Sequence, residues 1–218
     1  EIGQYLTANG IKHTRHGRGE LLARTAQLIS GQAVVGWFQG RMEFGPRALG
    51  NRSIIADARN KDNWQRVNLK IKYRESFRPF APSVLEDRAG EYFAIDVPAP
   101  YMLVTAQVHE HIRRDPQQAI PAVTHVDGSA RLQTVSRAQN PLYYDLIAAF
   151  EELTGCAVII NTSFNVRGEP IVCTPGDAYR CFMRTEMDYL VLGSFVLDKR
   201  EMAPLTEDRD WREIYQLD

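Results

Sequence analysis

The sequence predicts an α/β fold, either an α+β arrangement or an open twisted α/β sheet. Apolar residues at helical spacing alternate with short apolar runs that are typical of buried strands. These patterns do not follow a strict strand–helix–strand repeat, which favours a mixed sheet with flanking helices. Of the 218 residues, 44% are hydrophobic, so the chain can bury a core as one large domain or two small ones.

The first half of the chain contains three predicted strands and two predicted helices. In order, we predict a helix over 19–31, a strand over 33–38, a glycine- and arginine-rich loop over 40–53, a short strand over 54–55, a helix over 61–72 and a strand over 78–85. Pro79 and Pro82 interrupt the last strand, so we expect it at a sheet edge or with its prolines at the start of the strand.

The second half contains the most clearly delimited helix. Asn140 is its predicted cap, Pro141 its first residue and Gly155 its stop. The other predicted elements are strands over 101–108, 131–135 and 156–160, a charged loop over 109–118, a polar turn over 161–169, a short strand, a helix over 174–184, and apolar runs over 189–192 and 195–197.

Charge and composition exclude several classes of protein. The 26 basic and 27 acidic residues give a net charge of −1, which excludes a polycationic or acidic disordered tail as the dominant feature. The 3 cysteines form no Cys-x-x-Cys pair, so neither a disulfide framework nor a structural zinc site is indicated. No apolar stretch approaches the roughly 20 residues needed to span a bilayer, and the first residues lack the features of a signal peptide. We therefore expect a cytoplasmic protein with no membrane partner.

Basic residues are concentrated between Arg41 and Arg78. Ten basic and four acidic side chains give this segment a net charge of +6 within a chain of net −1. A solvated surface of arginines is one interpretation. The other is an anion site, and we favour it because Gly-Pro and Pro-Phe-Ala-Pro turns would hold the cations in fixed positions.

Polar residues follow a predicted buried strand at Asn161, Thr162, Ser163 and Asn165. Open sheets commonly bind ligands where core strands end, and hydroxyls and amides supply hydrogen bonds there. A polar turn that satisfies its own backbone is the alternative. A second turn, signalled by Asp127-Gly128, precedes the strand that carries Arg131.

Metal and nucleotide fingerprints are weak or absent. The pairs His13-x-x-His16 and His109-x-His111 come without a third ligand in sequence, so we predict no protein-held metal. The chain has neither a Walker-type phosphate loop nor a Gly-x-Gly-x-x-Gly motif. Any nucleotide must bind without these glycine-rich loops.

Four motifs, taken in order, resemble those of a known family. They are Gly40-Arg-Met-Glu-Phe-Gly-Pro-Arg-Ala-Leu-Gly-Asn-Arg-Ser-Ile54, Lys72-Tyr-Arg-Glu-x-x-Arg-Pro-Phe-Ala-Pro82, His125-Val-Asp-Gly-Ser-Ala-Arg131 and Asn161-Thr-Ser-Phe-Asn-x-x-Gly-Glu-Pro-Ile-Val172. They resemble the C-terminal domain of the carbamoyltransferases of nodulation-factor and antibiotic tailoring. The resemblance covers 19–199 and implies a start segment over 1–18 that follows a separate N-terminal domain. The six acidic residues within 200–218 predict an acidic C-terminal tail on the surface.

The resemblance implies a YrdC-like fold, with a twisted sheet around a basic cavity, and an ATP-dependent reaction. Carbamoyl phosphate would lose phosphate to give carbamate, which attacks the α-phosphorus of ATP and releases pyrophosphate, leaving carbamoyl adenylate. Mg²⁺ would accompany ATP, held mainly by phosphate oxygens. The N-terminal domain of the same polypeptide would hold iron and pass the carbamoyl group to a substrate hydroxyl.

The resemblance also implies roles for individual residues. The expected catalytic cations are Arg47, Lys72, Arg78 and Arg131; Asn161 and Ser163 would anchor the nucleotide or the carbamoyl group, and Asn165 is a further candidate. Fixed cations suit this chemistry because both substrates are polyanions that must be brought together.

Two rival hypotheses remain at this stage. One is a YrdC-type synthase of threonylcarbamoyl adenylate, although the motif over 41–54 is one that we associate with the carbamoyltransferases. The other is an RNA-binding module that uses the same basic concavity. RNA binding would weaken steeply with salt and need no carbamoyl phosphate, and we do not expect a nucleic-acid partner.

Overall fold

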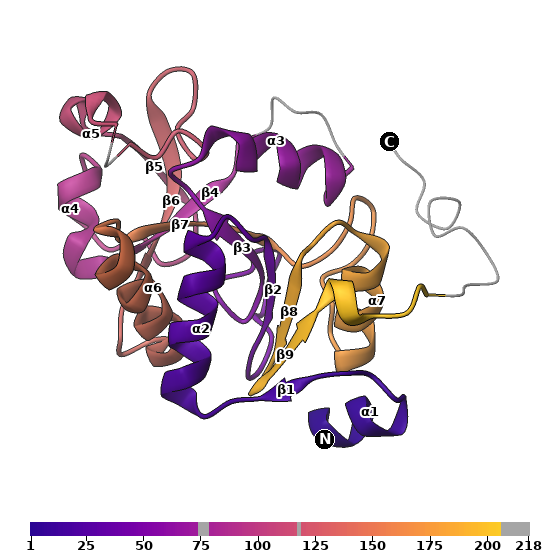
Figure 1. Ribbon diagram of the computed structural model, residues 1–218. Helices are drawn as coiled ribbons and strands as arrows, with labels where there is room; N and C mark the ends of the chain where they lie inside the picture. Colours follow the sequence, from indigo (N-terminus) through magenta and orange to yellow (C-terminus); the bar gives the residue numbers. More distant parts are fainter. Residues whose placement is uncertain (74–78, 117–118, 206–218) are drawn as a thin grey trace.

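The computed structural model describes residues 1–73, 79–116 and 119–205 (Figure 1). Within these ranges a 9-stranded mixed sheet has the order β1-β9-β8-β2-β3-β7-β4-β6-β5. The strands are β1 (Thr14–Arg15), β2 (Val35–Phe38), β3 (Arg52–Asp57), β4 (Ala81–Leu85), β5 (Val104–Gln107), β6 (Ser129–Val135), β7 (Val158–Ser163), β8 (Tyr189–Leu192) and β9 (Phe195–Asp198). The predicted α/β class with a mixed sheet is confirmed.

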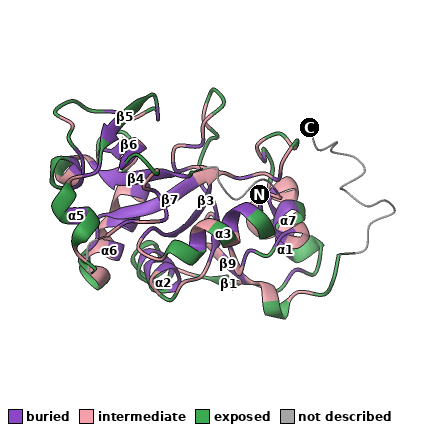
Figure 2. Ribbon diagram, turned by 90° about the horizontal axis from the view of Figure 1, so that it is seen from above, coloured by how far each residue is buried: buried purple, intermediate pink, exposed green. Residues whose placement is uncertain are grey.

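The helices lie around this sheet. They are α1 (Ile2–Ala8), α2 (Arg18–Ser30), α3 (Lys61–Lys70), α4 (Ala89–Tyr92), α5 (Glu110–Arg114), α6 (Pro141–Thr154) and α7 (Pro175–Arg184), with short 3₁₀ turns η1 (Glu86–Arg88) and η2 (Lys199–Glu201). Helices α2 and α6 pack side by side, and α7 packs on β2 and β8 (Figure 1). The strands are largely buried, whereas several loops beyond the sheet are exposed (Figure 2).

The ends of α6 and α7 follow their local sequence. The Asn140 side chain accepts a hydrogen bond from Tyr143 N at 3.1 Å, and Gly155 ends α6 with a φ of 73°. At α7, Thr174 and Asp177 form a reciprocal capping box. Capping signals therefore predict both helices well.

Strand β4 lies inside the sheet, between β7 and β6, so the expectation of an edge strand is wrong. The alternative, prolines at the start of the strand, is correct. Pro82 is the second residue of β4, and the pairing with β6 begins only at Ser83. The missing N–H of Pro82 therefore interrupts no hydrogen bond to β6.

Strand β7 extends through Ser163, three residues further than predicted. Asn161, Thr162 and Ser163 pair with β3, so tertiary pairing overrides the local preference of these polar residues for a turn. The predicted short strand after the turn is not formed; instead Val172 N donates to Phe164 O at 3.0 Å. Helix α5 occupies part of the predicted charged loop.

The predicted start segment over 1–18 contains α1 and β1. Strand β1 pairs with β9, with Thr14 opposite Val196, and α1 contacts α7. This segment therefore contributes an edge strand to the same sheet. Among the described residues, the helices are too short or too polar to cross a bilayer.

Candidate functional site

A small pocket lies beside the C-terminal end of β7 and the N-terminal end of β4. Its volume is about 100 Å³, and its lining comprises Pro46, Arg47, Ala48, Pro79, Phe80, Ala81, Met102, Arg131, Asn161, Thr162 and Ser163. Four of the seven predicted site residues meet here: Arg47, Arg131, Asn161 and Ser163. We call this the basic pocket. The sheet brings them together from segments far apart in the sequence.

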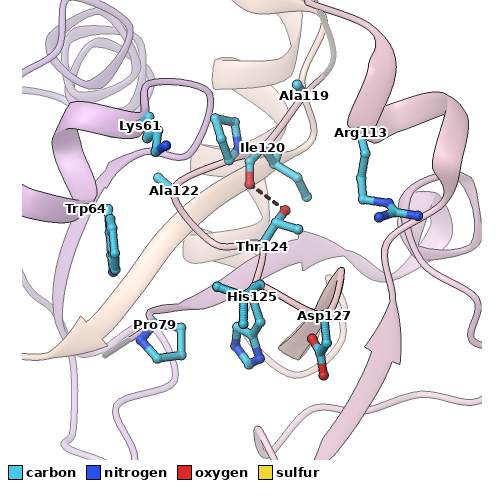
Figure 3. Close-up of a pocket in the computed structure, with 12 residues that line it drawn as sticks. Lys61, Trp64, Pro79, Arg113, Ala119, Ile120, Ala122, Thr124, His125 and Asp127 are labelled. Atoms are coloured by element: carbon cyan, nitrogen blue, oxygen red, sulfur yellow. Dashed lines mark hydrogen bonds between the residues drawn. The ribbon is translucent and has the colours of Figure 1, made fainter. Parts of the chain in front are cut away.

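The basic pocket adjoins two larger spaces. A cavity of about 340 Å³ shares Arg47 and Arg131 with it and adds Thr105 and His125. Pro79 and His125 in turn line a cavity of about 750 Å³. Figure 3 shows this outer cavity, with Lys61 and Trp64 on one side and Arg113 on the other. Together the three spaces can hold a ligand much larger than carbamoyl phosphate.

Arg47 and Arg131 are partly buried cations that make no hydrogen bond or ion pair with any described residue. Burial, and then the neighbouring charge of Arg47, lower the pKa of Arg131. Two desolvated like charges oppose folding unless an anion joins them. The pair is therefore the strongest evidence for an anion site.

The loop that carries Arg47 is fixed by its own hydrogen bonds. Glu43 Oε1 accepts from Leu49 N at 2.7 Å and from Asn51 N at 2.8 Å. Trp37 Nε1 donates to Gly50 O at 2.8 Å. These bonds hold the loop against β2 and β3, so the backbone that carries Arg47 is held in a fixed position.

Other cations of the basic segment have structural partners. Arg52 donates to the carbonyls of Gln39, Gly40 and Asn51, and its guanidinium lies 3.5 Å from the centre of the Phe38 ring. Further ion pairs join Arg59 to Asp57, Arg66 to Asp188 and Lys70 to Glu186. The segment is thus not one anion site; of its described cations, Arg47 lines the basic pocket and Lys61 lines the outer cavity.

Lys72 is buried and does not line the basic pocket. Its Nζ donates to Ser163 O, to Asn165 O at 2.9 Å and to Asn165 Oδ1 at 2.7 Å. Ser163 Oγ also donates to Asn165 Oδ1 at 2.8 Å. Lys72 and Asn165 therefore hold the end of β7, and neither residue lines the basic pocket. A role for Lys72 in binding phosphate stays a prediction, and Arg78 lies outside the described residues.

Sequence reasoning missed Gln133 and left His125 without a role. Gln133 lies two residues after Arg131 on β6 and donates from Nε2 to Leu49 O at 2.9 Å. The period of two along a strand, counted from Arg131, could have indicated it. Burial lowers the pKa of His125, against an opposing effect of Asp127, which favours the neutral form of this imidazole at the pocket wall.

Solved structures with a similar fold place the chain in a structural class. The full-length HypF structure in its phosphate- and nucleotide-bound form aligns with a TM-score of 0.58 and 14% identity, over 80% of this chain and 25% of that one. Sua5 of P. abyssi, complexed with L-threonine, aligns with a TM-score of 0.56 and 14% identity, over 83% of this chain and 48% of that one. The fold is therefore of the YrdC-like class.

Sequence comparison then defines the family. The family model described as "Carbamoyltransferase C-terminus" matches residues 26–199. An uncharacterised Synechocystis protein is 53% identical over 100% of this chain and 38% of its own length. The 3'-hydroxymethylcephem-O-carbamoyltransferase of Streptomyces clavuligerus is 39% identical over 78% of this chain and 31% of its own length. The chain belongs to the carbamoyltransferase family, in its C-terminal domain, and spans about a third of the length of these relatives.

Proposed function

We propose that this chain activates carbamoyl phosphate with ATP to form carbamoyl adenylate. The observation that carries the proposal is the pair of partly buried cations Arg47 and Arg131, which have no hydrogen-bond or ion-pair partner in residues 1–73, 79–116 and 119–205 and lie near a cavity of about 750 Å³. Family membership supplies the carbamoyl chemistry, and the fold shared with the nucleotide-bound HypF structure supports a nucleotide.

The reaction proceeds in two balanced steps. Water cleaves carbamoyl phosphate to carbamate and inorganic phosphate. A carbamate oxygen then forms a bond to the α-phosphorus of ATP while the bond from that phosphorus to pyrophosphate breaks. Arg47 and Arg131 bind the anionic oxygens and reduce the repulsion between the two substrates. The outer cavity, lined by Trp64 and Pro79, accommodates the nucleoside.

Mg²⁺ enters as part of the substrate MgATP. The described lining of the basic pocket contains arginines and neutral groups but no carboxylate. Asp127, at the outer cavity, accepts from Ser129 N at 2.9 Å and from Ser129 Oγ at 2.7 Å. These residues do not build a resident magnesium site, so phosphate oxygens hold the ion.

We further propose that the carbamoyl group passes to a hydroxyl on an acceptor bound by the rest of the full-length protein, as in an O-carbamoyltransferase. The relatives extend well beyond the part that this chain matches. An iron-containing N-terminal domain of the same polypeptide is the proposed partner, and the cytoplasm is the proposed location.

The test measures pyrophosphate and AMP formed by the full-length protein from MgATP and carbamoyl phosphate. We expect pyrophosphate release that depends on carbamoyl phosphate. A parallel reaction with bicarbonate and L-threonine tests the rival synthase activity. Product in the second reaction only, or in neither, would refute the proposal.

A further inference from the structure

A buried chain of polar side chains leads from α6 to the basic pocket. Tyr143 OH donates to Ser83 Oγ at 3.1 Å, and Ser83 Oγ donates to Gln133 Oε1 at 2.6 Å. Gln133 Oε1 also accepts from Asn161 Nδ2 at 2.8 Å. Ser83 and Gln133 are opposite each other on β4 and β6, and Asn161 is opposite Ala81 on β7. The four side chains are each at most 3% exposed.

Two backbone carbonyls fix the orientation of both amides. Asn161 Nδ2 donates to Ala48 O at 3.1 Å, and Gln133 Nε2 donates to Leu49 O at 2.9 Å. A carbonyl oxygen can only accept, so rotating either amide by 180° would set two oxygens against each other. The loop that carries Arg47 supplies both carbonyls, and it therefore determines which side-chain atom of Asn161 remains available to a ligand.

The remaining atom is Asn161 Oδ1, which is buried and has no hydrogen-bond partner among the residues that the structure describes. Asn161 is 1% exposed and belongs to the wall of the basic pocket together with Arg47 and Arg131. A buried acceptor without a donor is costly and rare in folded proteins, and a ligand that donates to it removes that cost. The fixed orientation shows that the ligand atom must be a donor.

The size of the pocket limits what that donor can belong to. At about 100 Å³ the basic pocket is too small for a nucleoside but holds a group of a few heavy atoms. Arg47 and Arg131 provide donors for anionic oxygens, and Asn161 Oδ1 provides an acceptor. Carbamate combines these features, since it carries a carboxylate and an N–H donor on one carbon.

We propose that Asn161 Oδ1 accepts a hydrogen bond from the amino group of the carbamoyl substrate and so selects it over acyl groups without N–H. Gln133 is the positioning residue, because it accepts from Asn161 Nδ2 and holds Oδ1 toward the ligand. This inference rests on the proposed function and specifies how its substrate is chosen.

The test compares carbamoyl phosphate with acetyl phosphate, which has a methyl group in place of the amino group. The readout is the ratio of kcat/KM values for pyrophosphate release by the full-length protein. Sites built to hydrogen-bond a substrate group reject analogues without it by about 10⁴-fold or more. We expect at least about 100-fold preference in the unaltered protein and at most about 10-fold in Asn161→Leu.

Gln133→Met is expected to lower the ratio about 10-fold while Asn161 itself is retained. Thr134→Val is the matched control, since Thr134 is an equally buried neighbour on β6 whose Oγ1 accepts from Ala99 N and takes no part in the network. The ratio does not depend on the fraction of folded protein. For a variant too slow to assay, the Kd values of the two acyl phosphates give the same comparison.

The outcomes separate the two proposals. No carbamoyl-phosphate-dependent pyrophosphate in the unaltered protein would refute the proposed function. An active protein whose ratio is unchanged in Asn161→Leu and Gln133→Met would overturn the role of Asn161 alone. An equal fall of this ratio in the control Thr134→Val would also overturn it. So would an effect of Asn161→Leu that is confined to a higher KM for ATP, because Asn161 Oδ1 would then contact the nucleotide.

Discussion

Gly50 lies directly against the ring of Tyr143, and a Cβ added to Gly50 would be 2.3 Å from Tyr143 Cδ1. This contact packs the loop that carries Arg47 against α6. Gly50 also has a φ of 109°, which L side chains rarely adopt. The position of Arg47 thus depends on a contact that only glycine permits.

Gly50→Ala is therefore expected to lower the free energy of unfolding by about 3 kcal/mol or more, from overpacking and backbone strain together. Gly45→Ala separates the two effects, because Gly45 has a φ of 128° but nothing within 4 Å of an added Cβ. We expect a loss of about 1–2 kcal/mol there. Urea unfolding measures both, and equal losses would contradict the packing contribution of Tyr143.

Arg131→Gln should reduce pyrophosphate release by about 10²–10³-fold, because it removes one of two fixed donors for the anionic substrate. The free energy of unfolding of this variant should not be lower than that of the unaltered protein, because burial and the charge of Arg47 both disfavour the charged form of Arg131. Pyrophosphate at millimolar concentration should raise the Tm of the unaltered protein and not that of the variant. A variant that is both inactive and much less stable would show that Arg131 is mainly structural.

Lys72→Met tests whether this lysine is a structural or a phosphate-binding residue. Its buried ammonium donates to oxygens of Ser163 and Asn165, so its loss removes several charge-assisted hydrogen bonds at the end of β7. We expect the free energy of unfolding to fall by about 2–4 kcal/mol, measured by denaturant titration. Unchanged stability with lost activity would instead support the phosphate role predicted from the sequence.

Lys199 should make stability depend on pH in the alkaline range. Burial lowers its pKa to about 8 from an ordinary value of 10.5. Between these values the unfolded chain binds more protons than the folded chain, so the contribution of this residue to the unfolding free energy rises with pH. The change in urea midpoint from pH 7.5 to pH 10 should be more positive in the unaltered protein than in Lys199→Met. Lys70→Met, which removes an exposed ion pair, is the control.

The features that could be predicted from the sequence are those set by local patterns. Helix α6 was predicted at both ends because Asn140 and Gly155 act within a few residues of the backbone they cap. The sequence motifs also indicate four residues that the fold brings together at the basic pocket: Arg47, Arg131, Asn161 and Ser163.

The remaining features depend on tertiary packing. No local sequence pattern distinguishes Lys72 from Arg131. The ammonium of Lys72 is enclosed by oxygens of Ser163 and Asn165, whereas the guanidinium of Arg131 has no partner in the described part of the chain. The interior position of β4 follows from pairing with β7 and β6, which no pattern near Pro82 encodes. Gln133 gains its role from Ser83 and Asn161, which lie on two other strands.

The order of strands also has a consequence for biosynthesis. Val35 on β2 pairs with Tyr189 on β8, and β1 at the start of the chain pairs with β9 near its end. On the ribosome β2 and β3 can meet early, but their outer partners emerge only when most of the domain has been translated. Until then the sheet has unprotected edges, so folding should be slow and prone to aggregation. The growing polypeptide is therefore expected to need chaperones that cover β2 and β3 while the C-terminal strands are synthesised.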